Sequence, residues 1–368
     1  MRFRKKKQHT CRLRGVYYAI SADRQRNEDM TLPHRGETGE LAHIENLSRL
    51  FVVLAILCIL SGCAATHPGE QPASFGKNMD LIEAATRGDL DMVRGFLAQG
   101  ADINARNDKG VTALYRASFC GHRDVVDLLL ANGASVDFKA RNGSTPLFAA
   151  AQNGYRDVAE LLLDKGADIN ARTDYGATPL FIASQLGHRD VVELLLIRGA
   201  EVNARMTAGL TALMVAPQNG QHREMVELLL SRGADINARS DDGATALFIA
   251  CQNGYRAVVE LLIAQGADVN ASTNNGATAL MVASANGHHD VAEVLLRRGA
   301  DVNARTDAGL TALIAASANG FRSVVESLLA HGARINARTT YGVTAVTAAA
   351  ANGHRDVVEL LRRHGGHT

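Results

Sequence analysis

The stretch Gly143-Ser-Thr-Pro-Leu-Phe-Ala-Ala-Ala-Gln-Asn-Gly154 returns in modified form along most of this 368-residue chain. Its closing glycine recurs at positions 88, 121, 154, 187, 220, 254, 287, 320 and 353, so every step is 33 residues except one of 34. A fixed period of this length predicts stacked copies of one supersecondary unit, each of which contacts its neighbours. We therefore expect a long continuous surface in place of a single globular core.

Residues 173–205 illustrate one copy. Thr178 followed by Pro179 predicts a helix start, because the hydroxyl can accept a hydrogen bond from a backbone amide and proline suits the first helical position. Gly187 ends this short helix. A second helix begins at Asp190 and has a wide apolar face. An extended loop with a turn completes the unit. Burial of each leucine or valine contributes about 1.5–3 kcal/mol, so a unit needs neighbours to be stable.

The recurring series Gly-x-Thr-Pro/Ala-Leu, Gly-His-x-x-Val-Val-x-Leu-Leu and Gly-Ala-x-Val/Ile-Asn-Ala is similar to the ankyrin repeat. The resemblance covers residues 77–368 in about nine copies. It implies an all-α solenoid of stacked helix-turn-helix units with extended β-hairpin-like loops. The family often has His after the Thr-Pro-Leu triplet, but here we expect apolar packing to replace most of that polar contact. The residues in this slot are Tyr115, Phe148, Phe181, Met214, Phe248, Met281, Ile314 and Thr347.

One copy is irregular near the middle of the array. Pro217 lies inside a short first helix, where it removes a hydrogen bond and clashes with the preceding turn. Gln221 is the extra residue of the 34-residue step. Together they predict a local kink, which either acts as a hinge or is neutral variation in a tolerant turn.

A hydrophobic run precedes the array. Residues 50–60 are eleven apolar residues, which are too few to span a bilayer comfortably and fit the core of a signal peptide. The sequence Leu60-Ser-Gly-Cys63 resembles a bacterial lipobox. That resemblance implies cleavage before Cys63 and attachment of lipid to this cysteine. A plain cleaved signal and a short uncleaved anchor are the alternatives.

These features predict four segments. Residues 1–46 are a basic extension, expected either to be disordered or to lie upstream of the true translation start, with Leu47 and Met30 as candidate starts. The rival interpretation is a basic tail that contacts anionic lipid or nucleic acid. Residues 47–62 form the signal peptide, residues 63–76 a flexible tether, and residues 77–368 the repeat array.

The net charge of +1 conceals two unequal parts. Residues 1–49 carry 11 Lys and Arg against 6 Asp and Glu, whereas the remainder carries 28 against 32. The mildly acidic array is not expected to bind phosphate backbones strongly, so nucleic acid is not an expected partner.

The chain shows no convincing constellation for chemistry. Equivalent positions of neighbouring repeats lie about 8–10 Å apart, whereas zinc ligands must lie within about 2 Å of one ion. We therefore expect structural roles for the histidines near the Gly-His turn, and no metal, cofactor or enzymatic activity. Cys120 and Cys251 lie four copies apart, too far for a disulfide. The recurring histidines are His122, His188, His222, His288 and His354.

The remaining candidate is the surface. In ankyrin-like arrays, recognition usually involves the loop tips and the exposed face of the first helix. Transferred position by position, this implies a partner-binding groove edged by cations and floored by amides, suited to an acidic or extended protein segment. The basic residues either bind a partner or pair with Asp174, Asp241 or Asp307. The predicted groove residues are Arg106, Lys139, Arg172, Tyr175, Arg205, Arg239, Gln152, Gln185, Gln218 and Gln252.

The sequence therefore predicts a protein–protein interaction scaffold, anchored to a bacterial membrane through a lipid and facing the periplasm or the cell surface. The amide row becomes alanine at residues 285, 318 and 351, which predicts that partner contacts concentrate between about residues 106 and 256. The alternative is a secreted effector or regulator that binds host or toxin proteins. No small-molecule substrate is expected.

Overall fold

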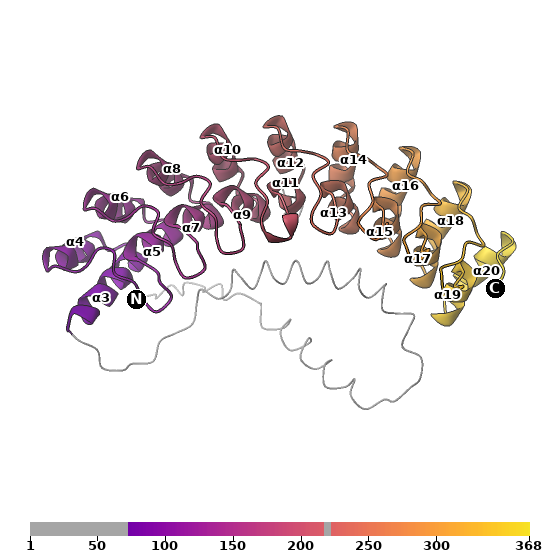
Figure 1. The fold of residues 1–368 in the computed structure, drawn as a ribbon, viewed down its shortest axis with the longest axis horizontal. Coiled ribbons are helices and arrows are strands. Elements are labelled where there is room, and N and C mark those ends of the chain that lie inside the picture. The colour runs from indigo at the N-terminus through magenta and orange to yellow at the C-terminus, as the bar shows by residue number, and fades with distance from the viewer. Residues whose placement is uncertain (1–72, 217–221) are drawn as a thin grey trace, which may run out of the picture. The chain divides into compact units, whose positions relative to one another are not determined.

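The computed structural model describes residues 73–216 and 222–368. Those residues contain 18 α-helices and no β-strand, which confirms the predicted all-α solenoid. Within the unit of residues 69–368, the first helices of the repeats lie on the inner side of an arc and the second helices lie on its outer side (Figure 1). In the part of the chain that is described, no helix has the length and apolarity that a membrane crossing requires.

The first helices of the repeats are α3 (Ala73–Arg87), α5 (Ala113–Cys120), α7 (Pro146–Asn153), α9 (Pro179–Leu186), α11 (Ala212–Val215), α13 (Ala246–Gln252), α15 (Ala279–Ala285), α17 (Ala312–Ala318) and α19 (Ala345–Ala351). The second helices are α4 (Leu90–Ala98), α6 (Arg123–Ala131), α8 (Arg156–Asp164), α10 (Arg189–Ile197), α12 (His222–Ser231), α14 (Arg256–Ala264), α16 (His289–Arg297), α18 (Arg322–Ala330) and α20 (Arg355–Arg363). A 3₁₀ turn, η1 (Thr207–Gly209), precedes α11.

The threonines start the first helices as predicted. The Thr178 hydroxyl accepts a hydrogen bond from the Phe181 amide at 3.2 Å, and six other repeats make the equivalent bond. This bond satisfies an amide that the helix itself leaves free. Gly187 closes α9 with φ of 80°, in the left-handed region that glycine adopts without strain.

Two rows of leucine form the core between the helical layers. The row on the first helices is no more than 2% exposed, and the row on the second helices is 0% exposed, so each repeat buries leucines against its neighbours. The first row is Leu81, Leu114, Leu147, Leu180, Leu213, Leu247, Leu280 and Leu313. The second row is Leu129, Leu162, Leu195, Leu229, Leu262, Leu295, Leu328 and Leu361.

The slot that the family often fills with His is largely apolar, and most of its occupants are buried, among them Phe181, Met214 and Met281. Tyr115 is an exception, because its hydroxyl lies 3.1 Å from the Ser144 hydroxyl of the next repeat. Burial is the main reason that the pKa of Tyr115 lies above its ordinary value, and this hydrogen bond works against the increase.

A polar contact between repeats occurs at a different position, the residue after the glycine turn. Nε2 of His188 lies 2.9 Å from the carbonyl oxygen of Gln152 in the preceding repeat. Three more histidines, at 122, 288 and 354, make the same contact. The His188 ring also lies against Gly154 of the preceding repeat. The rings of Tyr155 and Phe321 lie in the same way against Gly121 and Gly287. These rings tie each repeat to the end of the previous first helix.

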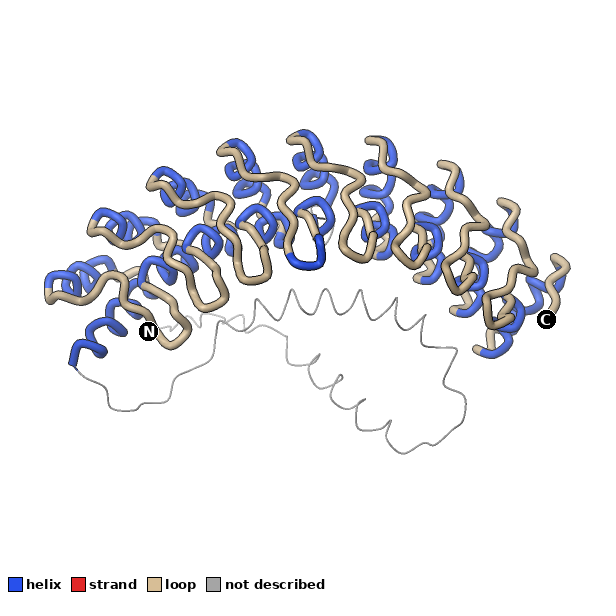
Figure 2. Tube along the Cα trace, in the orientation of Figure 1, coloured by secondary structure: helices blue, strands red, loops and turns tan. Residues whose placement is uncertain are grey.

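The loops are also tied to one another. The hairpin of one loop closes with a hydrogen bond from Thr173 N to Ala177 O at 3.0 Å, and its tip is linked backward by Asp174 N to Asn142 O, also at 3.0 Å. Every successive pair of loops from Lys109 onward shares such a backbone bond. Figure 2 shows these hairpins side by side on the inner side of the array.

The middle repeat is irregular in the residues that are described. Helix α11 ends at Val215, and Thr211 makes no side-chain capping bond to it. The Thr211 hydroxyl is buried without a hydrogen-bond partner. Pro217 and Gln221, on which the predicted kink depends, lie outside the described residues.

The two ends of the array differ from its interior. Helix α3 begins at Ala73, so it includes the last residues of the segment predicted to be a tether. Asn78 on this helix accepts a hydrogen bond from the Asp102 amide at 3.0 Å, as the loop asparagines do in later repeats. At the other end Arg362 is exposed, in a slot that holds leucine in several inner repeats.

Candidate protein-binding surface

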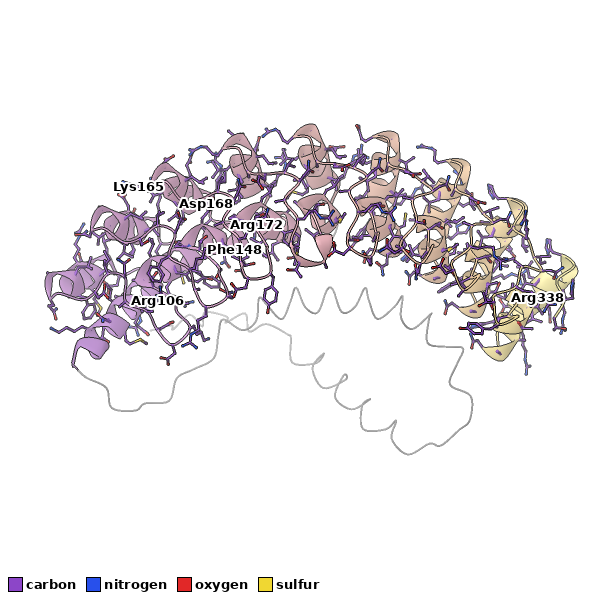
Figure 3. All side chains as sticks on the ribbon, viewed as in Figure 1. Arg106, Phe148, Lys165, Asp168, Arg172 and Arg338 are labelled. Atoms are coloured by element: carbon purple, nitrogen blue, oxygen red, sulfur yellow. The ribbon has the colours of Figure 1, made fainter. Side chains whose placement is uncertain are left out.

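The candidate surface consists of the loops and first helices on the inner side of the arc (Figure 2). Arg106, Arg172 and Arg338 lie on this row of loops from one end of the array to the other (Figure 3). The backbone bonds between loops position each residue of the row, because they hold consecutive hairpins in the same register.

The arginines at this loop position, here called the arginine row, form hydrogen bonds to other loops of the array. Arg172 Nη1 donates to the carbonyl oxygen of Arg205 at 2.8 Å, and Arg239 Nη2 donates to that of Ser272 at 2.7 Å. Arg305 makes the equivalent bond to Arg338 O at 2.6 Å. Each guanidinium therefore joins its loop to the same position of the next loop, 33 residues later.

The alternative that these arginines pair with nearby aspartates is confirmed at one position. Arg205 Nη2 lies 3.0 Å from the Asp241 carboxylate. Asp174 and Asp307 form no ion pair within the described residues. Arg172 instead approaches Glu201 at 3.5 Å. These side chains are about half exposed, so each pair contributes at most about 1 kcal/mol.

The first two members of the row behave differently. The Arg106 guanidinium lies over the Phe138 ring, 3.8 Å from its centre, in a cation–π contact. Lys139 is exposed, and its charge is one of the influences on the neighbouring Asp137 carboxyl. Both residues retain an exposed face toward solvent.

The predicted amide row does not form an open floor. Gln185 is only 8% exposed, and Gln152 and Gln252 are half-buried. The backbone carbonyls of Gln152 and Gln252 accept the histidine bonds from the next repeat. Gln218 lies outside the described residues. The stacking of neighbouring first helices covers this position, which the helical period alone does not reveal.

Two loops carry an exposed tyrosine at the same position, Tyr175 and Tyr341. Tyr175 is 53% exposed, and among the described residues the large hydrophobic side chains with comparable exposure are Tyr341, Ile197 and Met92. A shallow hollow of about 550 Å³ lies along the following extended segment. It is lined by Arg172, Glu201, Val202, Asn203, Ala204 and Arg205.

Asparagines of the extended loops form a series of hydrogen bonds between repeats, here called the asparagine ladder, which was not predicted from the sequence. Asn170 Oδ1 accepts a hydrogen bond from the Glu201 amide at 2.9 Å, and asparagines of other loops repeat this bond. Asn203 also donates to Gly233 O at 3.1 Å. The recurrence of Asn in every Val/Ile-Asn-Ala segment was the available signal. A side chain that both donates and accepts suits this place.

Asp137 breaks this ladder. Its carboxylate accepts from the Asp168 amide at 3.0 and 3.1 Å but has no N–H to donate onward. Partial burial is the main cause that raises the pKa of Asp137, the amide bond opposes the shift, and the charge of Asp168 adds to it. The ionised Asp137 side chain therefore keeps the accepted bond of the ladder but cannot make the donated bond that Asn203 makes to Gly233.

The structure brings together one set of side chains with the composition of a catalytic triad. The Ser327 hydroxyl lies 3.1 Å from His289 Nε2, and His289 Nδ1 lies 3.4 Å from Asp290. Ser327 is 7% exposed and lies within α18, where helical hydrogen bonds occupy the backbone amides that an oxyanion would need. Its hydroxyl also bonds Glu293, whose pKa is lowered by that bond and by Arg297. The cluster fits a structural link between α16 and α18.

No group of His, Cys, Asp or Glu within the described ranges has the arrangement of a metal site. Cys251 is completely buried, and burial raises the pKa of its thiol, which makes the thiolate scarce. The surface therefore offers contact residues along a rigid row of loops. That arrangement is suited to binding a macromolecule.

The family comparison agrees with this architecture. The family model described as ankyrin repeats (3 copies) matches residues 81–173, 142–206, 172–240, 213–306 and 304–367. The chain belongs to the ankyrin repeat family. Proteins of this kind generally act as non-enzymatic scaffolds that bind other proteins. No curated protein matches this chain.

Proposed function

We propose that this protein is a scaffold that binds a partner protein through the inner surface of its array, with the contacts centred on the loop that carries Tyr175. The observation that carries the proposal is the exposure of this aromatic ring three residues after Arg172, which lines the hollow along residues 201–205. Tyrosine and arginine are the residues most often responsible for binding energy at protein interfaces.

The internal bonds of the arginine row support this role. Arg172 and Arg205 use part of their donor capacity within the array, and a guanidinium has five N–H donors. Such arginines are held in one orientation before a partner arrives, which lowers the entropy lost on binding. An acidic or extended segment is the partner chemistry that suits them.

A crosslinking experiment tests this proposal. A photoreactive phenylalanine analogue replaces Tyr175 in one strain and Tyr341 in another. Tyr341 is the matched control, because it has the same loop position, is 70% exposed and lies outside the predicted contact region of residues 106–256. We expect a partner protein crosslinked at 175 and not at 341. Equal crosslinking at both positions, or none at 175, contradicts the proposal.

A substitution measures the same contact. Tyr175→Ala is expected to weaken binding of the crosslinked partner about 30-fold, the loss of roughly 2 kcal/mol that an aromatic anchor provides. Tyr341→Ala is expected to leave the affinity unchanged. Further replacement of Arg172, Arg205 and Arg239 must be accompanied by a thermal unfolding measurement, since these side chains also connect loops.

We further propose that Cys63 carries a lipid that holds the array at a bacterial membrane, facing the periplasm or the cell surface. The support is the sequence Leu60-Ser-Gly-Cys63 directly after the apolar residues 50–60. Cys63 lies outside the described residues. Residues 64–72, with the following turn of α3, would separate the anchor from the first repeat.

Mass analysis of the mature protein tests the anchor. We expect an N-terminal peptide that begins at Cys63 and carries acyl chains, and Cys63→Ser should abolish both the lipid and cleavage. Membrane fractionation then distinguishes anchored from secreted protein. Peptides from residues 1–29 in the cellular protein would contradict the later translation start, and an unmodified Cys63 would contradict the anchor.

A further inference from the structure

A second surface becomes visible when the same slot is compared between repeats. Arg198, which follows α10, donates to the Asp164 carboxylate on α8 at 2.8 Å and approaches Glu160 at 3.4 Å. An arginine at the end of one second helix is thus neutralised by an acid at the end of the preceding one.

The equivalent arginine at α16 lacks this acid. Arg298 occupies the position of Arg198, but Ala264 on α14 stands where α8 has Asp164. Glu260, the counterpart of Glu160, is bonded by Arg256 of its own helix at 2.9 Å. In the described part of the chain, Arg298 forms no ion pair and its side chain is exposed. Its guanidinium presents donors with no carboxylate to receive them.

A groove lies at this place. It has a volume of about 710 Å³ and lies between α12 and α14 on the outer layer, with Arg298 among its lining residues. Its apolar lining comes from Leu230, Leu261 and Ala264. The small side chains of Ser231 and Ala264 at the helix ends leave this space open.

The remaining charges of the groove are neutralised by neighbours. Glu227 is paired with Arg223 at 2.9 Å, and Glu260 is paired with Arg256. Arg298 is therefore the lining charge that lacks a counterpart among the described residues. A carboxylate that enters from another molecule would restore the pair that Arg198 and Asp164 make within the chain.

We propose that this outer groove binds a peptide segment of a partner protein in which an aliphatic side chain such as Leu is followed by Asp or Glu. The apolar side chain packs on Leu230 and Leu261, and the carboxylate binds the Arg298 guanidinium. The site is separate from the inner surface, because α12 and α14 belong to the outer layer (Figure 1). A scaffold with both sites can hold two partners at once.

The test uses the full chain and the fluorescein-labelled peptide Gly-Gly-Ala-Leu-Asp-Leu-Gly-Gly in a fluorescence anisotropy titration. We expect saturable binding, weakened about tenfold by Arg298→Ala and by replacement of the peptide aspartate with asparagine, as the loss of one charge-assisted contact implies. Tyr175→Ala should leave this binding unchanged, which separates the outer groove from the inner surface.

Ala264→Asp provides the sharper variant. It supplies the missing carboxylate from within the chain, so it should close the site and weaken the peptide about tenfold while preserving the fold. Ala330→Asp is its matched control, because residue 330 is the same slot on α18 and lies outside the groove. Thermal unfolding monitored by circular dichroism confirms that both variants are folded.

Four results would overturn the proposal. They are no binding to the wild-type chain at millimolar peptide, equal binding of the asparagine peptide, equal effects of Ala264→Asp and Ala330→Asp, and displacement of the peptide by an equal concentration of inorganic phosphate. The last result would assign Arg298 to simple anions and not to a peptide.

Discussion

The ring of His188 lies against Gly154, and its Nε2 atom lies 2.9 Å from the carbonyl oxygen of Gln152 in the preceding repeat. The contact joins the start of helix α10 to the end of helix α7, which is the first helix of the preceding repeat. Glycine is required beneath the ring, because a Cβ atom at 154 would lie 2.5 Å from His188 Nδ1.

Gly154→Ala is expected to destabilise the array by about 2–4 kcal/mol. About 1–2 kcal/mol arises from the left-handed backbone at φ of 77°, and the rest from the clash with the ring. The measurement is the urea midpoint of unfolding. Gly166→Ala is the matched control, since Gly166 has φ of 86° and open space around its Cβ position. Equal losses for the two variants would mean that the ring moves away without cost.

Substitutions at His188 separate packing from hydrogen bonding. His188→Phe keeps a ring on Gly154, as Phe321 does on Gly287, and should cost about 1 kcal/mol for the lost bond to Gln152. His188→Ala removes both the ring and the hydrogen bond, and it should lower the free energy of unfolding by about 2–3 kcal/mol. Chemical denaturation provides both values. Equal losses for the two variants would show that the bond, which both remove, contributes more than the ring packing, which His188→Ala alone removes.

The fold could be predicted from the sequence because its determinants are local. Thr178 and Gly187 specify where α9 begins and ends, and the leucine rows follow the helical period. These features repeat every 33 residues, so each copy supports the same prediction.

The candidate site was less predictable because it depends on contacts between copies. The positions of Arg172 and Arg239 were evident, but their bonds to carbonyls of the next loop require the register between loops. Gln185 was expected to be open and is 8% exposed, because neighbouring first helices pack closely around it. The Arg298 groove is revealed by the comparison with the Arg198–Asp164 pair.

Asp137→Asn is expected to stabilise the protein at neutral pH by about 1 kcal/mol, since the amide can donate to the loop glycine that follows α8, as Asn203 does to Gly233. The pKa of Asp137 is raised in the folded state, mainly by burial. The ionised form therefore weakens the fold. This penalty is absent below the unfolded pKa of about 3.9, grows as the pH rises through the higher folded pKa, and is complete above it.

The gain from Asp137→Asn should accordingly be small near pH 3 and full at pH 7, as measured by the difference in melting temperature from the wild type. The reverse change, Asn170→Asp, should place the same penalty on the next loop and lose stability most at pH 7. A gain for Asp137→Asn that does not depend on pH would show that the carboxylate is well accommodated.

The capping threonines provide the last prediction. Thr178→Val should destabilise the protein by about 1 kcal/mol, because the Phe181 amide loses its acceptor. Thr211→Val should instead be neutral or stabilising by up to about 1 kcal/mol, because the Thr211 hydroxyl is buried without a partner and makes no capping bond. The two changes are chemically identical and occupy the same slot, so the opposite signs in urea unfolding isolate the cap. Equal losses would show that Thr211 caps α11 in solution, and that the irregularity of the middle repeat begins after Val215.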